Sequence, residues 1–448
     1  MNNYGFHFAE SYQGYWNIAQ IGRKIPGTLH IEKHSIRLEL FWNNVTHVDL
    51  RVIPSATGYA YTDIENKKTC YYFVLKGLQL MSVSWFGKHQ SQYKLDVNNF
   101  CMSDKPRFST NGIVNCCIRT QLMDKWVWDY TQESYSDLWP FKENESIEVK
   151  YQAKPSLTLF ESVLFELYLR FGYEAYTPNA DGFGMSTHTF LNLRLKKKQK
   201  FYDALDFAES VIWLFSLLWN NQFSPDFIEF RTSKGKFIYK KSDKYQFKYF
   251  DVINKSLRTD ISDFDVKELS YSIERWFRFV EKEKVSIGSF FETQYNEHII
   301  PSAKIKNYMS VVDGLIKNEK TEKVEVEHGC ADLLDKISRY INKKERKMLN
   351  RLMFRNEKFT LKEKLEKVID GLHSYIELNI EDDFSSKAVN TRNVLTHVCK
   401  RTEKIYKKDQ YMDLAFCLEL LIMAFLLQQI GVHSEISKKI IGVISSPE

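Results

Sequence analysis

The segment KAVNTRNVLTHVCK, residues 387–400, contains an arginine, an asparagine and a histidine within a short stretch: Arg392, Asn393 and His397. An imidazole titrates near neutral pH, so His397 can take up or release a proton during a reaction. A guanidinium stays charged and binds phosphate oxygens through a fork of N–H donors, which suits Arg392 to an anionic substrate. The amide of Asn393 can orient either partner. Together these residue types suit acid–base chemistry at a phosphate.

The helix that would carry these side chains is expected over residues 384–403. Three side chains at its start can accept the N-cap hydrogen bond: Asp382, Asp383 and Ser385. The two aspartates suit a helix N-terminus better than a magnesium site, because the positive end of the helix dipole favours carboxylates. At about 100° per residue, the apolar side chains gather in one core stripe. The stripe comprises Phe384, Ala388, Leu395, Val398 and Cys399.

The three polar residues lie away from that stripe. Asn393 and His397 stack at i and i+4, about 180–220° from Phe384, whereas Arg392 lies at about 80° and reaches round with its long side chain. We therefore expect His397 to face solvent, a cleft or another subunit. The spacing also fits three solvated residues of an ordinary helix surface, because an Arg-x4-His pattern is short and arises often by chance.

The whole chain has 448 residues, enough for two or three domains with buried cores. Its net charge of +6 permits a nucleic-acid partner without requiring one. The seven cysteines are scattered and include no Cys-x-x-Cys pair, which favours reduced thiols over disulfides or a thiolate metal site. We predict a cytoplasmic protein with no metal, no cofactor and no signal peptide. The most apolar segment, residues 413–432, contains acidic residues and is expected to be a buried helix rather than a membrane span.

Periodicity divides the chain at about residue 262. Residues 1 to about 150 alternate polar and apolar positions, which predicts a sandwich or barrel-like sheet with strands in 27–42, 70–87, 91–100 and 146–152. Helical spacing follows in 161–171 and 204–222, and residues 226–241 predict a hairpin that turns at Ser233–Gly235. The remainder, residues 263–448, is expected to be almost all helix. The helices are expected at 265–284, 286–298, 302–318, 330–341, 343–354, 360–378, 384–403, 410–430 and 434–441.

The pattern RNVLTH, residues 392–397, resembles the signature of HEPN domains, in which an arginine and a polar residue are followed by a histidine four to six positions on. VNTRNVLTH followed by a leucine-rich helix is similar to the C-terminal domain of ApeA-type anti-phage defence proteins. The segment GYWNIAQIGRKIPGTLHIEKHSIRLELFW (14–42) is similar to the opening of that family, and ALDFAESVIWLFSLLW (204–219) resembles its helical middle. The resemblance implies an α+β chain: a β-rich ApeA-like region over 1–262, then an all-α HEPN bundle over 263–448.

Many HEPN domains are ribonucleases, so the resemblance implies a metal-independent endoribonuclease used in abortive anti-phage defence. RNA, with tRNA among the candidates, would be cleaved by attack of its 2′-hydroxyl on the adjacent phosphate. His397 would transfer a proton, Arg392 would bind the phosphate and Asn393 would orient one of them. A homodimer through the HEPN domain would bring a second His397 and Arg392 to the same phosphate. The N-terminal region would sense a phage-derived trigger or hold the nuclease inactive.

Two other functions remain open: a non-catalytic HEPN protein that binds nucleic acid or a protein, and a scaffold whose sheet binds a peptide or glycan. Residues 343–359 hold seven basic residues against two acidic ones and form either an RNA-binding surface or a solvated helix face. The candidate RNA-binding residues there are Lys343, Lys344, Arg346, Lys347, Arg351 and Arg355. The basic run LRLKKKQK, 193–200, is expected to be a loop or helix surface rather than an RNA site.

Overall fold

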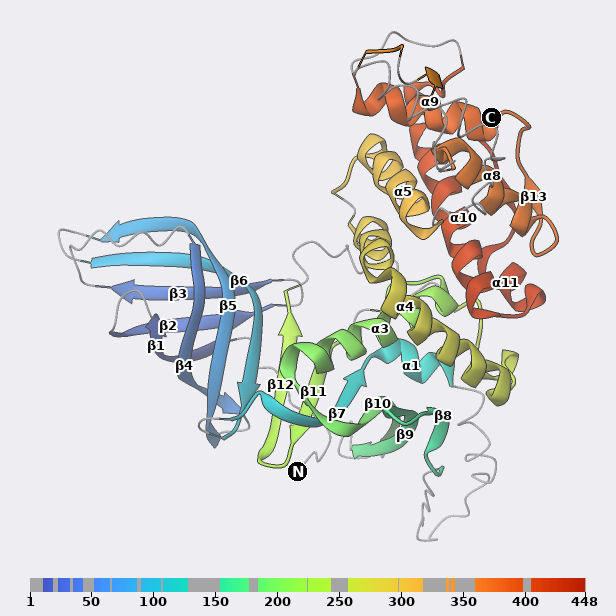
Figure 1. Cartoon of the computed structure of the whole chain (residues 1–448). Coiled ribbons are helices and arrows are strands. Elements are labelled where there is room, and N and C mark those ends of the chain that lie inside the picture. The colour runs from blue at the N-terminus through green and yellow to red at the C-terminus, as the bar shows by residue number, and fades with distance from the viewer. Residues whose placement is uncertain are drawn as a thin grey trace, which may run out of the picture. The chain divides into compact units, whose positions relative to one another are not determined.

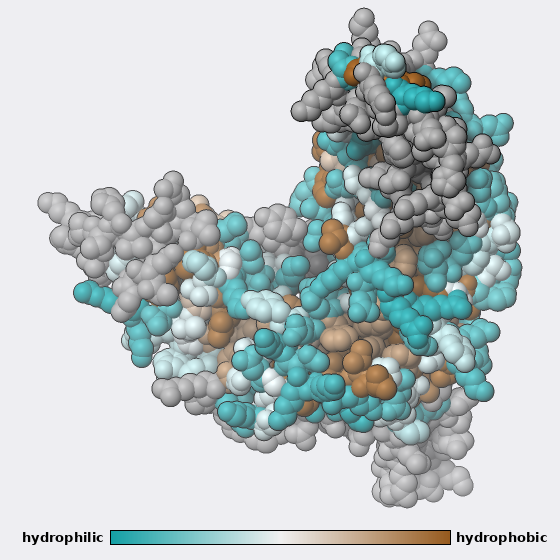
Figure 2. All heavy atoms as spheres, viewed as in Figure 1, coloured by the Kyte–Doolittle hydropathy of each residue, from teal (hydrophilic) through white to brown (hydrophobic). Residues whose placement is uncertain are grey.

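The structure is a computed structural model of the chain (Figure 1). It describes residues 11–18, 23–32, 35–42, 52–64, 67–86, 90–105, 108–127, 154–176, 184–223, 225–242, 257–296, 298–316, 336–337, 340–342, 359–397 and 404–447. The chain forms two compact units. The N-terminal unit comprises residues 1–278, 295–298 and 430–440, and the helical unit comprises 279–294, 299–429 and 441–448. Among the coloured residues in Figure 2, hydrophilic ones are widespread and hydrophobic ones form smaller groups.

The first strands of the N-terminal unit close into a barrel, drawn in blue in Figure 1. They are β1 (Ser11–Ile18), β2 (Lys24–Ile31), β3 (Ile36–Trp42), β4 (Val52–Ile64), β5 (Lys67–Phe86) and β6 (Gln90–Ser103). Their order is β3-β2-β1-β4-β5-β6, and pairing of β3 with β6 completes the circle. Trp16, Phe73 and Phe100 are buried in its core. This barrel confirms the β-rich N-terminal region and the strands predicted in 27–42, 70–87 and 91–100.

The same sheet continues from β6 through a second set of strands. They are β12 (Gly235–Lys241), β11 (Phe227–Thr232), β7 (Asn111–Arg119), β10 (Gly184–Lys200), β9 (Phe165–Tyr176) and β8 (Leu157–Glu161). Helix α3 (Phe201–Trp219) packs on β7 and β10, and α1 (Gln121–Trp126) packs on β10. The helix predicted over 204–222 and the hairpin predicted over 226–241 are therefore confirmed. The strand predicted at 146–152 lies outside the described residues.

Two predictions in this part of the chain are wrong. Residues 161–171 belong to β8 and β9 rather than to a helix, because β9 lies between two other strands and buries side chains on both faces. On one face Phe165 contacts Phe207 of α3 and Phe277, so its apolar residues lose simple alternation. Residues 193–200 form the end of β10, not a loop or helix surface.

The described part of the chain after residue 262 is mainly helical, which confirms the predicted fold class. Helix α4 (Val266–Tyr295) consists of two helical stretches joined by a kink at Glu283 (φ −120°, ψ 23°), close to the predicted boundary between helices at 265–284 and 286–298. It is followed by α5 (Pro301–Leu315), α8 (Leu361–Leu372), α9 (Phe384–Thr396), α10 (Tyr411–Ile430) and α11 (Ser434–Ile441). Helix α8 is shorter than predicted, because the chain turns after it into β13 (Leu378–Asn379), which pairs with β14 (Ile444–Ser445). The helix predicted at 343–354 and most of that at 330–341 lie outside the described residues.

Helix α10 provides much of the core of the helical unit. In the described part of the chain, Lys408–Ile430 is the one stretch long and apolar enough to span a membrane, and 67% of its most apolar window is buried within the protein. Its acid Glu419 accepts hydrogen bonds from the Tyr308 hydroxyl (2.7 Å) and the Gln294 amide (3.1 Å). Burial raises the pKa of this carboxyl. Such burial is typical of a core helix of a bundle.

Candidate active site

Helix α9 carries the signature residues, and its buried face follows the predicted stripe only in part. Phe384 and Ala388 are fully buried, whereas Leu395 is half-buried. The helix contacts α5 and α8. Asp383 is at the N-cap position but makes no side-chain cap bond. Its carboxylate instead lies 3.1 Å from the Lys387 ammonium.

The Arg392 guanidinium and the Asn393 amide contact each other directly. Nη1 of Arg392 donates to Oδ1 of Asn393 at 3.2 Å, and both side chains are half-buried. An arginine has five N–H donors. No carboxylate within the described residues forms an ion pair with Arg392, so its charge and its other donors remain available to an anion.

His397 marks the end of the helix, which is shorter than the predicted 384–403. Its backbone is extended (φ −121°, ψ 142°), and its N–H still donates to the carbonyl of Asn393 at 2.8 Å. The residue is exposed, and no side chain in the described ranges bonds to its imidazole. The bond from the His397 N–H keeps the predicted i and i+4 relation of Asn393 and His397, although the backbone angles of His397 are no longer helical. That the two side chains share a face stays a prediction. Val398 and Cys399 lie outside the described residues.

The segment after the signature returns to α9 through contacts that sequence reasoning missed. The Tyr406 N–H donates to Oγ1 of buried Thr391 at 2.9 Å, and the Asn390 amide donates to the carbonyl of Lys404 at 3.2 Å. The Tyr406 ring lies 6.1 Å from that of Phe384, centroid to centroid. Thr391 lies at the helical angle of the core stripe. A polar residue among buried apolar ones needs a hydrogen-bond partner, and this was the signal in the sequence that could have predicted the contact. These contacts fix the two residues immediately before Arg392.

The other chemical candidates are placed as follows. All six candidate RNA-binding residues, Lys343, Lys344, Arg346, Lys347, Arg351 and Arg355, lie outside the described residues. Among residues that are described, no group of three His, Cys, Asp or Glu side chains is arranged to hold a metal ion. Cys116 and Cys117 are buried in β7, and burial raises the pKa of Cys117 to about 12, so its thiol stays protonated at neutral pH.

Comparison with known proteins gives two family matches. Residues 306–436, which include α9 and α10, match the model described as Apea-like HEPN. Residues 11–278, which include the barrel and the second set of strands, match ApeA N-terminal domain 1. No curated protein and no solved structure matches the chain.

The two matches divide the chain as its secondary structure does, with the sheet in the first and the signature helix in the second. HEPN domains are often nucleases, and the match places Arg392, Asn393 and His397 inside such a domain. The N-terminal match alone covers more than half of the 448 residues. The protein is therefore a HEPN-containing defence protein that belongs to the ApeA family.

Proposed function

We propose that the protein is a metal-independent endoribonuclease that acts in the cytoplasm in abortive anti-phage defence. Arg392, Asn393 and His397 form its catalytic set, and tRNA is the substrate we would test first. The N-terminal unit holds the nuclease inactive or responds to a phage-derived trigger. The observation that carries the proposal is an exposed imidazole, His397, that follows within five positions an arginine with no carboxylate partner in the described chain.

The proposed reaction is a transesterification within the RNA. The 2′-oxygen of the ribose forms a bond to the adjacent phosphorus, and the bond from that phosphorus to the 5′-oxygen breaks. One proton leaves the 2′-hydroxyl and one joins the departing 5′-oxygen, and a 2′,3′-cyclic phosphate remains. His397 carries one of these protons, and general acid–base catalysis by such a group contributes roughly 10²–10⁴-fold.

Arg392 has the complementary role at the phosphate. Its planar guanidinium stabilises the negative charge that develops on the phosphorane oxygens. The bond from Arg392 to Asn393 holds the guanidinium close to the helix end where His397 lies. In this arrangement Asn393 is a positioning residue for the arginine, a role that the sequence alone left open.

The reaction needs two proton-transfer groups, and one signature supplies one histidine. We therefore propose a homodimer in which the HEPN domains of two copies place both His397 side chains at one phosphate. Mixing tests this. A roughly tenfold excess of inactive His397→Ala chain should reduce the specific activity of wild-type chain to about a tenth, since most dimers become mixed. Unchanged activity in the mixture would exclude a composite site.

The nuclease activity is tested with purified full-length protein and total tRNA in EDTA. Wild type should cleave and leave 2′,3′-cyclic phosphate ends, and His397→Ala should lose roughly 10²-fold or more of that rate. The matched control is His373→Ala, because His373 is also exposed and also caps a helix of the HEPN match. It should cleave like wild type.

The same variants in infected cells separate an enzyme that needs a trigger from a binding protein. If the protein is a triggered nuclease, cells with wild type or His373→Ala resist phage and cells with His397→Ala do not. Equal protection by all three would contradict catalysis by His397 and favour the non-catalytic alternative.

A further inference from the structure

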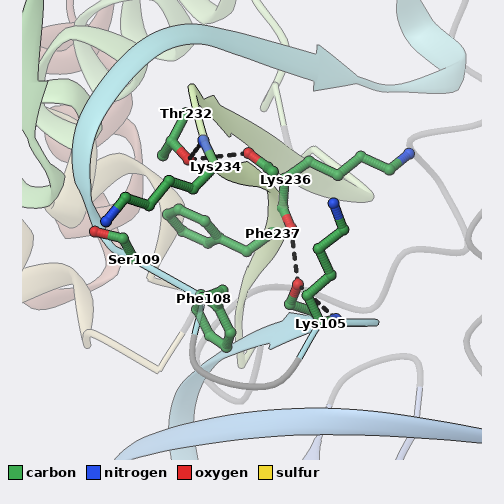
Figure 3. Close-up of a pocket in the computed structure, with 9 residues that line it drawn as sticks. Lys105, Phe108, Ser109, Thr232, Lys234, Lys236 and Phe237 are labelled. Atoms are coloured by element: carbon green, nitrogen blue, oxygen red, sulfur yellow. Dashed lines mark hydrogen bonds between the residues drawn. The ribbon is translucent and has the colours of Figure 1, made fainter.

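A shallow hollow in the N-terminal unit, away from the signature helix in the sequence, combines positive charge with an aromatic pair. The hairpin β11–β12 contributes Thr232, Lys234 and Lys236, and the segment between β6 and β7 contributes Lys105 and Phe108 (Figure 3). The space between them is about 200 Å³ and opens to solvent. The side chains of Lys105 and Lys234 lie on either side of the rings of Phe108 and Phe237, whereas that of Lys236 points away from the rings (Figure 3).

The backbone of this hollow is fixed by side-chain hydrogen bonds. Ser103 Oγ donates to the carbonyl of Lys236 (2.8 Å) and accepts from the N–H of Lys105 (3.2 Å). Thr232 Oγ1 donates to the carbonyl of Gly235 and accepts from the N–H of Lys234, both at 3.1 Å. The positions from which the lysines project are therefore defined before any ligand arrives.

The charge at this hollow is only partly neutralised. Lys236 pairs with Glu229 at 3.1 Å, and the exposed acid Asp104 is the sequence neighbour of Lys105. The exposed ammonium groups of Lys105 and Lys234 form no ion pair with any residue in the described ranges. The hollow therefore retains two unpaired cations, and it favours an anion.

The aromatic pair gives the hollow a second recognition feature. The rings of Phe108 and Phe237 are stacked at 5.2 Å with an interplanar angle of 28°. Phe237 is fully buried and stacks in turn on Phe230, so the half-buried Phe108 packs against a ring that is fixed in the core. A partly exposed phenyl ring beside ammonium groups is a combination that can bind a nucleobase next to its phosphate.

The positive surface extends beyond the hollow along one end of the sheet. Ile113 of β7 pairs with Thr232 of β11 on one side and with Gln199 of β10 on the other, so the hairpin turn and the end of β10 flank the start of β7. The end of β10 carries the exposed residues Lys197, Lys198 and Lys200. The side chain of Lys198 lies close to Gly112 of β7, since its Cδ would be 4.0 Å from a Cβ placed on that glycine.

Size and extent together identify the kind of ligand. The space of about 200 Å³ includes open solvent, so the hollow does not enclose a whole small molecule, and a ligand here would lie along the surface. The exposed lysines at the end of the neighbouring strand β10 add positive charge to the same end of the sheet. We propose that this face of the N-terminal unit binds single-stranded nucleic acid, with a phosphate between Lys105 and Lys234 and a base on Phe108. It would give the N-terminal unit a direct means of sensing nucleic acid.

The test is a binding measurement that does not depend on cleavage. The full-length His397→Ala protein is titrated against a fluorescent oligothymidine of about 12 nucleotides, within the length that one small β-barrel domain binds. The pocket variant adds Lys105→Ala and Lys234→Ala. The control adds Lys267→Ala and Lys282→Ala, two exposed lysines on α4 that remove the same charge elsewhere.

The pocket variant should bind at least about tenfold more weakly, and its plot of log K against log salt should be shallower by about 0.7, as for one phosphate of a single strand that is no longer neutralised. The control should match its parent, and Phe108→Leu should weaken binding by about tenfold with an unchanged salt slope. Equal affinities of the pocket variant and the control would overturn the proposal.

Competitors identify the source of the bound group. Displacement by a mononucleotide at concentrations similar to the oligonucleotide would show that the hollow takes a free nucleotide, and the assignment to a strand would be wrong. Equal displacement by polyglutamate would show an acidic protein surface as the ligand and would also overturn it. Because the readout is binding of DNA by a His397→Ala protein, its result is independent of whether the HEPN domain cleaves RNA.

Discussion

The guanidinium of Arg392 donates to the side-chain oxygen of its sequence neighbour Asn393 at 3.2 Å. The partner is a neutral amide, so it orients the guanidinium without neutralising it. A carboxylate in the same place would form a charge-assisted bond and compete with a substrate phosphate. We therefore expect the second position of the signature to need a side-chain acceptor without charge.

Asn393→Asp tests that requirement, because it replaces an amide by a carboxylate of the same shape. We expect kcat/KM for RNA cleavage to fall by about 10- to 100-fold, which corresponds to the roughly 1.5–3 kcal/mol of a hydrogen bond to a charged group. Asn393→Ala should lose less, since Arg392 keeps its charge. Steady-state kinetics of the two variants decides the matter, and a larger loss in Asn393→Ala would show that Asn393 acts on the substrate itself.

The bond between Thr391 and Tyr406 predicts a stability effect close to the signature. Thr391→Val keeps the shape of the buried side chain but leaves the Tyr406 N–H without its acceptor. An unsatisfied buried donor costs about 1–3 kcal/mol, so the melting temperature of the helical unit should fall by several degrees. Ser310→Ala is the control, because the exposed Ser310 hydroxyl bonds only to the carbonyl one turn back. Calorimetric unfolding of both variants measures the difference, and equal values would show that water replaces Thr391.

The sequence indicated the candidate residues of the site but not the exact end of the helix that carries them. Residue types and spacing indicate Arg392, Asn393 and His397 as the candidate site, and their catalytic role stays a prediction. The end of the helix was not predictable, because Val398 and Cys399 continue the apolar period beyond it. The structure ends α9 at Thr396, and His397 is extended. Periodicity indicates which residues could share a face, but it does not report where the hydrogen-bond ladder ends.

The sheet shows a related limit. Strands of the barrel were recognised where one face is buried and the other is not, as in β3, whose burial alternates along Ile36–Trp42. Alternation does not identify β9, because Leu167, Tyr168 and Leu169 are all buried in succession. It does not identify the end of β10 for the opposite reason. Its register on β7 shifts between Arg194 and Gln199, and the lysines within that irregular stretch are exposed in succession.

The buried Glu419 predicts how the stability of the helical unit depends on pH. Burial raises its pKa in the folded chain above the value of about 4.5 that the unfolded chain has. The Glu419 carboxyl therefore stays protonated to a higher pH in the folded chain than in the unfolded chain. Its contribution to the free energy of unfolding is fully present below pH 4.5 and decreases as the pH rises through the raised pKa. Glu419→Gln should therefore raise the melting temperature at pH 8 by a few degrees and have little effect at pH 4.

Glu292→Gln is the matched control for Glu419, because it makes the same chemical change at an exposed position of α4. Calorimetry at the two pH values compares the variants. A Glu419→Gln protein that is less stable than wild type at pH 8 would show that the bonds from Tyr308 and Gln294 outweigh the cost of burying the charge.

The barrel predicts a large effect from a very small substitution. A Cβ added to Gly14 of β1 would lie 2.0 Å from the carbonyl oxygen of Tyr59 and 2.5 Å from Cα of Ala60, so the backbone of β1 or β4 must move. Overpacking of this kind costs about 1–3 kcal/mol or more, and Gly14→Ala should lower the melting temperature of the N-terminal unit by several degrees.

Gly172 of β9 separates steric conflict from the general effect of replacing a strand glycine. A Cβ there would meet its nearest atom at 3.6 Å, an ordinary contact, so Gly172→Ala should leave stability unchanged or raise it. Thermal unfolding of the two variants gives the comparison. If Gly14→Ala proved as stable as Gly172→Ala, the close approach of β1 to β4 at Gly14 would be wrong. The atoms that the new Cβ would meet there include backbone atoms of β4, which cannot move aside as a flexible side chain can.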